Sequence, residues 1–231
     1  MFGLDEWIAG VSDEGSIMIV MLVATLLGLR HATDPDHLAA VSTLVVSGRE
    51  RATRAAARLG AAWGLGHAVT LVAFGLPILL AERYLPDIVQ RGAETTVAAL
   101  IAFLAVRLLV RWRHGAFAAT SAGHETHRHP ARTPAGAFGI GLVHGMGGSA
   151  GVGVLLLAAV PSRTLALVAL VVLALFTAVS MTVVTTGFGA VLSVRRVGGA
   201  LTTAAPVLGL SSLAFGLWYA AAAWSLAPYP F

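Results

Sequence analysis

The chain has 231 residues, of which 57% are hydrophobic and only 11% are charged. Its mean hydropathy is +0.83. Soluble domains carry about 25% charged residues, so this composition excludes an ordinary soluble protein and predicts an integral membrane protein. The absence of cysteine excludes disulfides and thiolate metal sites, and the net charge of +4 comes from basic residues that are all arginine. We interpret these arginines as markers of loop sidedness and expect no nucleic-acid partner.

Residues 1–15 form a short acidic tail that contains no basic residue. A secretory signal peptide begins with basic residues, so the pattern does not predict a cleaved signal. We expect this tail to lie outside the cytoplasm.

Six apolar segments follow, each long enough to cross a bilayer, which needs about 20 residues. They lie near residues 16–46, 61–81, 93–112, 137–160, 164–192 and 201–226. Alternate connections are rich in arginine, namely Arg49, Arg51, Arg54 and Arg58, then Arg111, Arg113, Arg128 and Arg132, then Arg195 and Arg196. The opposite connections hold only Arg83, Arg91 and Arg163. The positive-inside rule therefore places the arginine-rich connections in the cytoplasm and both termini outside it.

The first apolar segment is too long for one straight span, because it would rise about 46 Å against a hydrocarbon core of about 30 Å. Asp34 is a good N-cap and Pro35 a good first helical residue, so we expect a second half-helix to begin there. On an unbroken helix, His31 and His37 would point about 120° apart. A break before Pro35 lets His31, Asp36 and His37 converge on one point.

A short internal repeat links the first and fourth segments. Gly28-Leu29-Arg30-His31 recurs as Gly141-Leu142-Val143-His144, and a glycine-rich run at 147–153 follows the second copy as the proline break follows the first. Interruptions at matching positions of two halves indicate a transport site near the membrane midplane. We therefore predict an all-α polytopic membrane protein built as a 3+3 inverted repeat. Its parts are a first half at 16–112, a cytoplasmic loop at 113–136 and a second half at 137–231.

The first segment carries the strongest chemical signal, in His31, Asp34, Asp36 and His37. Ionisable side chains in apolar spans are costly and usually mark an ion path. Imidazole and carboxylate ligands suit a divalent transition metal such as Ni²⁺, Co²⁺ or Zn²⁺. The alternative is an internal ion pair, since Arg30 and Asp34 are four residues apart.

Two further histidines lie in apolar segments. His67 sits in Trp63-Gly64-Leu65-Gly66-His67, and His144 lies beside the glycine-rich run. Each is a candidate metal ligand on the ion path. The alternative for each is a histidine hydrogen-bonded across helices that the glycines bring close together.

Two other polar groups have less specific interpretations. The histidines of the connection after the third segment indicate either loose metal contact or a solvated linker; they are His114, His124, His127 and His129. The hydroxyls of the fifth segment are expected to bond to helix backbone; they are Ser180, Thr182, Thr185 and Thr186.

The motif from His31 to His37 fits the H-x4-D-H signature, so the chain resembles the nickel/cobalt transporter family. Leu65-Gly66-His67 is similar to that family's later L-G-H-S-T motif, with alanine in place of serine. The resemblance implies metal recognition by His31, Asp34, Asp36 and His37, with His67 as a further contributor. The family's F-D-T-A-T-E motif is absent. In its place stands the segment 141–150, which looks like that of short nickel-permease-like membrane proteins associated with urease maturation.

These observations predict a permease of the bacterial plasma membrane for Ni²⁺, with Co²⁺ as a second substrate, rather than an enzyme. The ion is substrate, no cofactor is expected, and a cytoplasmic metallochaperone is a candidate partner. Two alternatives stay open. One is an intramembrane serine protease of rhomboid type, because Gly147-Gly148-Ser149-Ala150-Gly151 fits G-x-S-x-G. It lacks a later histidine as base. The other is a membrane metal sensor or accessory protein that shows no flux.

Histidine ligation predicts a pH dependence. Protons compete with the metal for neutral imidazoles, so affinity for Ni²⁺ should fall as the pH is lowered through about 7 to 6. Equilibrium dialysis of the purified protein against Ni²⁺ at a series of pH values measures this. An affinity that stays constant over that range contradicts histidine ligation.

Overall fold

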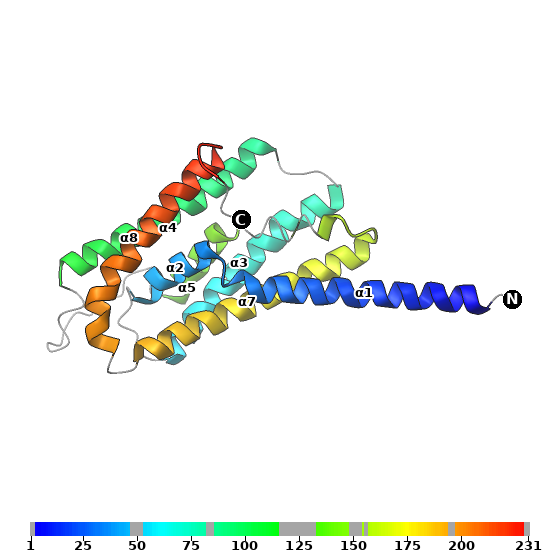
Figure 1. Ribbon diagram of the computed structural model, residues 1–231, viewed down its shortest axis with the longest axis horizontal. Helices are drawn as coiled ribbons and strands as arrows, with labels where there is room; N and C mark the ends of the chain where they lie inside the picture. Colours follow the sequence, from blue (N-terminus) through cyan, green and yellow to red (C-terminus); the bar gives the residue numbers. More distant parts are fainter. Residues whose placement is uncertain are drawn as a thin grey trace.

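The computed structural model describes residues 3–46, 53–81, 86–115, 133–147, 154, 157–193 and 197–228. These residues form helices and contain no strand, which confirms the predicted all-α class for the described part of the chain. The helices are α1 (Gly3–His31), α2 (Pro35–Val46), α3 (Thr53–Ala81), α4 (Asp87–Arg113), α5 (Pro134–His144), α7 (Arg163–Ser193) and α8 (Val197–Ala223), labelled as in Figure 1.

The predicted break in the first apolar segment is confirmed. α1 ends at His31, α2 begins at Pro35, and the two helices are bent by 43° relative to each other. The amide of Asp34 still bonds to the carbonyl of His31 at 3.2 Å, and the Asp34 carbonyl accepts the amide of Leu38 at 3.0 Å. Pro35 has no amide hydrogen to donate, so the first helix stops where the second begins.

Four helices, α3, α4, α7 and α8, are long and apolar enough to cross a membrane. The bent pair of α1 and α2 makes a fifth if it counts as one span. The predicted span at 137–160 is not one continuous helix, because α5 ends at His144 after 11 residues. Such a helix rises only about 16 Å, roughly half the hydrocarbon thickness. Among the described residues beyond it, Val154 and residues 157–158 are again helical.

Several predicted features lie outside the described residues. These are the arginines Arg49, Arg51, Arg83, Arg128, Arg132, Arg195 and Arg196, the loop histidines His124, His127 and His129, and Gly148, Ser149, Ala150 and Gly151 of the glycine-rich run.

The helices meet around the break between α1 and α2. Figure 1 shows α1 running along α7 with its N-terminal part projecting beyond the other helices, and α4 and α8 lying side by side. One apolar cluster joins α1, α3 and α7 around Leu71, and a second joins α2 to α5 and α7 around Trp63. His67, one of the predicted metal ligands, lies one helical turn from each of these residues. It is therefore placed between the two apolar clusters.

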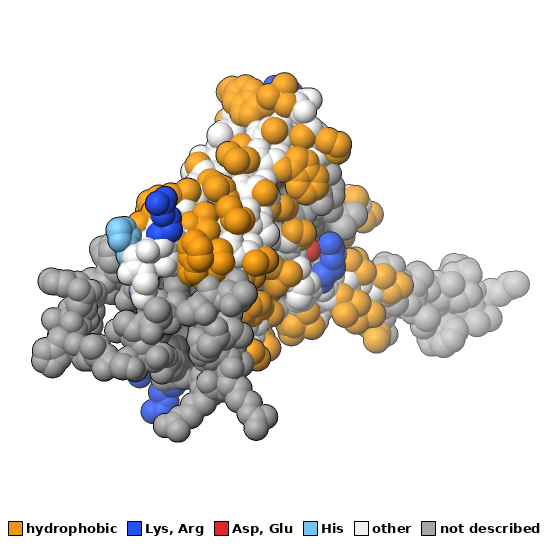
Figure 2. All heavy atoms as spheres, turned by 60° about the vertical axis from the view of Figure 1, so that its left-hand side comes forward, with side chains coloured by type: hydrophobic (Ala, Val, Ile, Leu, Met, Phe, Trp, Pro, Cys, Tyr) orange, Lys and Arg blue, Asp and Glu red, His pale blue; other side chains and the backbone are white. Residues whose placement is uncertain are grey.

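The outer surface is apolar, as lipid contact requires. Figure 2 shows one face on which the described residues present mainly hydrophobic side chains, with a few arginines, an acidic side chain and a histidine among them. Exposed hydrophobic residues occur on every long helix, for example Leu22, Val69, Phe103, Val171 and Leu210.

Glycines allow the helices around the break and His67 to approach one another closely. A Cβ placed on Gly28 of α1 would lie 2.7 Å from the carbonyl oxygen of Leu173 in α7. A Cβ on Gly64 of α3 would lie 2.8 Å from the carbonyl oxygen of Ala178 in α7. A Cβ on Gly141 of α5 would collide with the backbone of α3. Backbone atoms cannot swing aside as side chains can, so these helices must separate if the glycines are replaced.

Two glycines of α5 offer a matched test of this packing. Gly141→Ala places a methyl group against the carbonyl oxygen of Trp63, whereas the same change at Gly139 meets nothing within 4 Å. We expect Gly141→Ala to destabilise the fold by about 1–3 kcal/mol through overpacking. Thermal unfolding in detergent, followed by circular dichroism, compares the two variants. Equal unfolding midpoints would show that α5 does not pack on α3 in this way.

Candidate metal site

Four buried histidines come together from four different helices. His31 is the last residue of α1, His37 lies in the first turn of α2, His67 is the central residue of α3, and His144 is the last residue of α5. These four residues and Asp36 are each at most 5% exposed. Imidazoles in such a position are inaccessible to bulk water, so this arrangement is closed on all sides.

His31 and His67 make the shortest contact in the cluster. Their Nε2 atoms lie 2.8 Å apart, and the ring of His37 lies 4.4 Å from that of His31 and 5.0 Å from that of His67. Two nitrogens bound at a right angle to one ion, each about 2.1 Å from it, are separated by about 3 Å. The spacing of these Nε2 atoms is therefore compatible with two ligands of a single metal ion.

Asp36 connects two of the imidazoles. Nδ1 of His37 donates to Oδ1 of Asp36 at 3.0 Å, and Nε2 of His144 donates to Oδ2 at 3.2 Å. The rings of His37 and His144 lie 4.4 Å apart. Asp36 also lies in the first turn of α2, where the helix dipole favours an ionised carboxylate. One carboxylate thus holds the start of α2 against the end of α5.

Three imidazole nitrogens have no hydrogen-bond partner among the described residues. They are Nε2 of His37, Nδ1 of His67 and Nδ1 of His144. A buried polar atom without a partner costs free energy, and a bound cation offers such a nitrogen a ligand bond. The donor set is nitrogen and carboxylate oxygen without thiolate, which suits a divalent transition metal.

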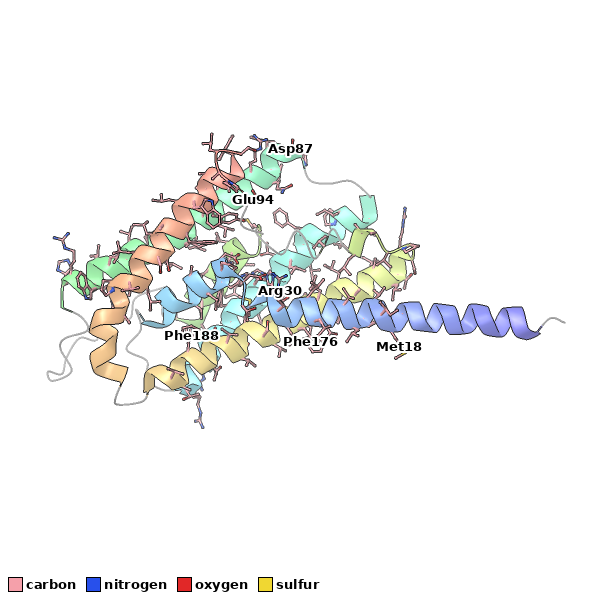
Figure 3. All side chains as sticks on the ribbon, viewed as in Figure 1. Met18, Arg30, Asp87, Glu94, Phe176 and Phe188 are labelled. Atoms are coloured by element: carbon pink, nitrogen blue, oxygen red, sulfur yellow. The ribbon has the colours of Figure 1, made fainter. Side chains whose placement is uncertain are left out.

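Asp34 has a different position from the other predicted ligands. Its Oδ1 lies 3.1 Å from Nη2 of Arg30 and its Oδ2 lies 3.5 Å from Nδ1 of His31. The ion pair with Arg30, the alternative that the spacing allowed, is therefore present. Figure 3 labels Arg30 near the end of α1, at the break. Asp34 faces Nδ1 of His31, whereas Nε2 of the same ring faces His67. Asp34 is thus placed to orient the ring of His31, as carboxylates commonly do for ligating histidines.

The structure thus brings five of the six predicted residues into two groups that could each hold a metal ion. One group is His31, His37 and His67, and the other is Asp36, His37 and His144; within each group the ligand atoms lie within 4.8 Å of one another. Asp34 belongs to neither group.

Two further buried residues were not named as candidates in the sequence analysis, and the first of them lies beside the site. Trp63 is 1% exposed, and its ring lies 5.8 Å from that of His37 and 5.7 Å from that of His144. Its position one turn before His67 was the available signal. The other is Glu94 in α4, labelled in Figure 3, where it is buried and accepts from the amide of Gln90 at 3.1 Å. A glutamate in an apolar segment was the signal there.

The remaining predicted polar residues lie elsewhere. His114 is exposed just beyond the end of α4. The four hydroxyls of α7 that the sequence analysis named donate to backbone carbonyls, as expected: Ser180 to Gly28 at 2.9 Å, Thr182 to Ala178 at 2.7 Å, Thr185 to Met181 at 2.6 Å and Thr186 to Thr182 at 2.6 Å.

Comparison with known proteins shows the family of the chain. The profile of the NicO family, described as high-affinity nickel-transport protein, matches residues 17–135, which include His31, Asp36, His37 and His67. The chain belongs to this family. The resemblance drawn from the H-x4-D-H motif is thereby confirmed, and the family is one of transporters rather than enzymes. His144 lies beyond the matched residues, so its place in the site rests on the geometry.

The urease accessory protein UreH from Bacillus sp. (strain TB-90) is a curated relative of this NicO chain. The two are 28% identical over 143 residues, which are 60% of this chain and 62% of UreH. The match thus covers less than two thirds of that relative. No solved structure matches the chain significantly.

The two aspartates of the motif offer a test of the site. Asp36→Asn removes the charge between His37 and His144, whereas Asp34→Asn removes one that Arg30 already balances. We expect Asp36→Asn to weaken Ni²⁺ binding by at least about 100-fold and Asp34→Asn by less, about 10-fold. Isothermal titration calorimetry measures both affinities. Equal losses would contradict the separate roles given to the two carboxylates.

Proposed function

We propose that this NicO protein is a secondary permease for Ni²⁺, with Co²⁺ as a second substrate, which binds the ion at its buried histidine and aspartate cluster. The observation that carries the proposal is the convergence of five buried imidazole and carboxylate side chains from four helices. Groups of this kind among apolar helices usually belong to an ion path. The ligand set and the family both favour nickel.

Nickel is the preferred ion in this proposal on chemical grounds. Nitrogen and oxygen sites generally bind Ni²⁺ more tightly than Co²⁺. The site contains no thiolate, because the chain has no cysteine. Co²⁺ has similar ligand preferences and is therefore expected to compete, at higher concentration.

The architecture that we propose for transport is six spans in two inverted halves, 16–112 and 137–231. The connection 113–136 lies in the cytoplasm, where a metallochaperone is a candidate partner, while the tail 1–15 and the C-terminus lie outside. The arginine pattern of the connections supports this orientation in a bacterial plasma membrane. In this arrangement α1 with α2, and α5 with the helical residues after it, are the two broken spans.

Matching contacts in the two halves support the repeat. The repeat glycine of α1, Gly28, packs against the backbone of α7, and the repeat glycine of α5, Gly141, packs against the backbone of α3. The hydroxyl of Thr70 in α3 donates to the carbonyl of Leu142 at 2.9 Å. The hydroxyl of Ser180 in α7 donates to the carbonyl of Gly28, also at 2.9 Å. Each broken span is thus held by the long helix of the other half.

The position of the site along the helices supports a midplane location. His67 is the central residue of α3, and the crossing of Gly64 with Ala178 brings α3 against the middle of α7. Two helices, α1 and α5, end at His31 and His144 respectively, beside the candidate site. Helices that stop inside a bundle are typical of transporter substrate sites.

Alternating access follows from this arrangement. The site is closed in the present structure, so one half must rock against the other to expose it to each side in turn. Asp36 and His144 lie across the boundary between the proposed halves, at 3.2 Å. Their contact is therefore a place where the relative movement of the halves changes the ligands of the ion.

Radiolabelled Ni²⁺ flux into proteoliposomes tests the permease directly. Wild-type protein should show saturable flux that Co²⁺ reduces, and His37→Ala should reduce it to the level of empty liposomes, because His37 belongs to both metal groups. Reversing the imposed gradient reports the direction of transport.

His114→Ala is the matched control, because His114 is exposed and lies outside both metal groups. Its flux should equal that of the wild type. Absence of flux in folded wild-type protein that still binds Ni²⁺ would overturn the permease and favour a metal sensor or accessory protein. Peptide cleavage dependent on Ser149 would instead favour the protease.

A further inference from the structure

We infer that the site contains two overlapping ion positions that share His37, and that the ion moves from one to the other during transport. This inference rests on the proposed permease function. Position A consists of His31, His37 and His67, and position B consists of Asp36, His37 and His144.

The distances separate the two positions. Two ligands on opposite sides of one ion, each about 2.1 Å from it, are at most about 4.2 Å apart. The five residues form two groups whose ligand atoms lie within 4.8 Å, and neither group includes both His67 and His144. The rings of those two histidines are 6.0 Å apart, whereas the ring of His37 lies 5.0 Å from that of His67 and 4.4 Å from that of His144. In this arrangement the residues surround two neighbouring positions rather than one.

His37 has the chemistry that a shared ligand needs. Its Nδ1 faces Oδ1 of Asp36 at 3.0 Å, on the side of position B. Its Nε2 has no hydrogen-bond partner among the described residues and is available to an ion at position A. A neutral imidazole offers one lone pair at a time, and the nitrogen that offers it depends on which one carries the hydrogen. One ring can therefore serve the two positions in turn by changing its tautomer.

The two positions differ in their relation to the moving parts. The ligands of position A come from α1, α2 and α3, all in the first of the two proposed halves. Position B joins α2 to α5 through the contact of Asp36 with His144, so its ligands come from both halves. Rocking of the halves breaks position B and leaves position A assembled. Transfer between them therefore couples the location of the ion to the conformation of the protein.

Trp63 supports position B from one side. Its ring lies against both His37 and His144, at an interplanar angle of 90° to the latter, and it is part of the apolar cluster that joins α2 to α5 and α7. A buried aromatic ring in this place holds the two imidazoles toward Asp36. Movement of α5 away from α3 would release His144 from this contact.

Equilibrium binding of Ni²⁺ to the purified full-length chain separates two positions from one. His67→Ala leaves the ligands of position B intact, and His144→Ala leaves those of position A intact. Each should retain binding within about 10-fold of the wild type. His37→Ala damages both positions, and so does the double variant His67→Ala with His144→Ala. In each of these two proteins the affinity for Ni²⁺ should fall by at least about 100-fold. His114→Ala is again the control.

Flux of radiolabelled Ni²⁺ in the same variants tests the transfer. His67→Ala and His144→Ala should each bind the ion yet lose at least about 10-fold in flux at saturating Ni²⁺. If either single variant loses as much binding as the double variant, the ligands form one position and the inference is wrong. Retained flux in both single variants also overturns it. His67→Gln and His144→Gln, which fill more of the buried volume, repeat the comparison where an alanine variant unfolds.

These outcomes are distinct from failure of the permease. If wild-type protein binds Ni²⁺ but shows no flux, the permease fails whatever the variants bind. If wild-type protein transports Ni²⁺ while both single variants lose binding to the level of the double variant, the permease stands and the two positions do not.

Discussion

The centre of this molecule depends on two helices that stop inside the bundle. α1 ends at His31 and α5 ends at His144, and carbonyls at these ends accept from outside their own helix: Gly28 from the hydroxyl of Ser180, and Leu142 from that of Thr70. Such ends are unfavourable in an apolar environment unless polar groups or ions gather around them. Asp36, at the start of the next half-helix, binds His37 and His144 and thereby connects the interrupted elements. These interruptions bring the candidate ligands to one place.

Close helix packing gives those interruptions a fixed geometry. α3 touches α5 through glycines on both helices: Gly66 approaches the backbone of Phe138, and Gly141 approaches that of Trp63. Van der Waals contact is the main source of helix association in lipid, so removing side chains at a crossing strengthens it by allowing close approach. Because of this crossing, His67 lies beside His31 at the end of α1, and His144 lies beside Asp36 at the start of α2. The glycines thus affect the candidate metal site by setting the distance between α3 and α5, although none of them supplies a ligand side chain.

The sequence was sufficient to predict the part of the site that is local. An N-capping aspartate followed by Pro35 predicts the break, and the break brings His31, Asp36 and His37 together because they are close along the chain. The ion pair of Arg30 with Asp34, which the sequence analysis gave as the alternative to a metal site, is local for the same reason. Placing His67 and His144 in the cluster required the crossing of α3 and α5, which depends on contacts between residues far apart in sequence. Sequence patterns made them candidates and could not give their partners.

The span prediction was limited for a related physical reason. The segment 137–160 is apolar along its whole length, so its summed hydropathy predicts one span. The sum does not show that the helix ends at His144 after 11 residues. Glycines after this residue were the signal for a break, and they do not define where the helix stops as a proline does. The described residues therefore show four candidate spans, or five with the bent pair.

The proposed repeat is symmetric in packing and asymmetric in chemistry. Thr70 and Ser180 make equivalent hydrogen bonds to the broken span of the other half. Four of the five ligands, however, come from the first half, and only His144 comes from the second. A site held mainly by one half keeps the ion with that half while the other moves. In the proposed rocking, the contact of His144 with Asp36 crosses the boundary between the halves and must form and break.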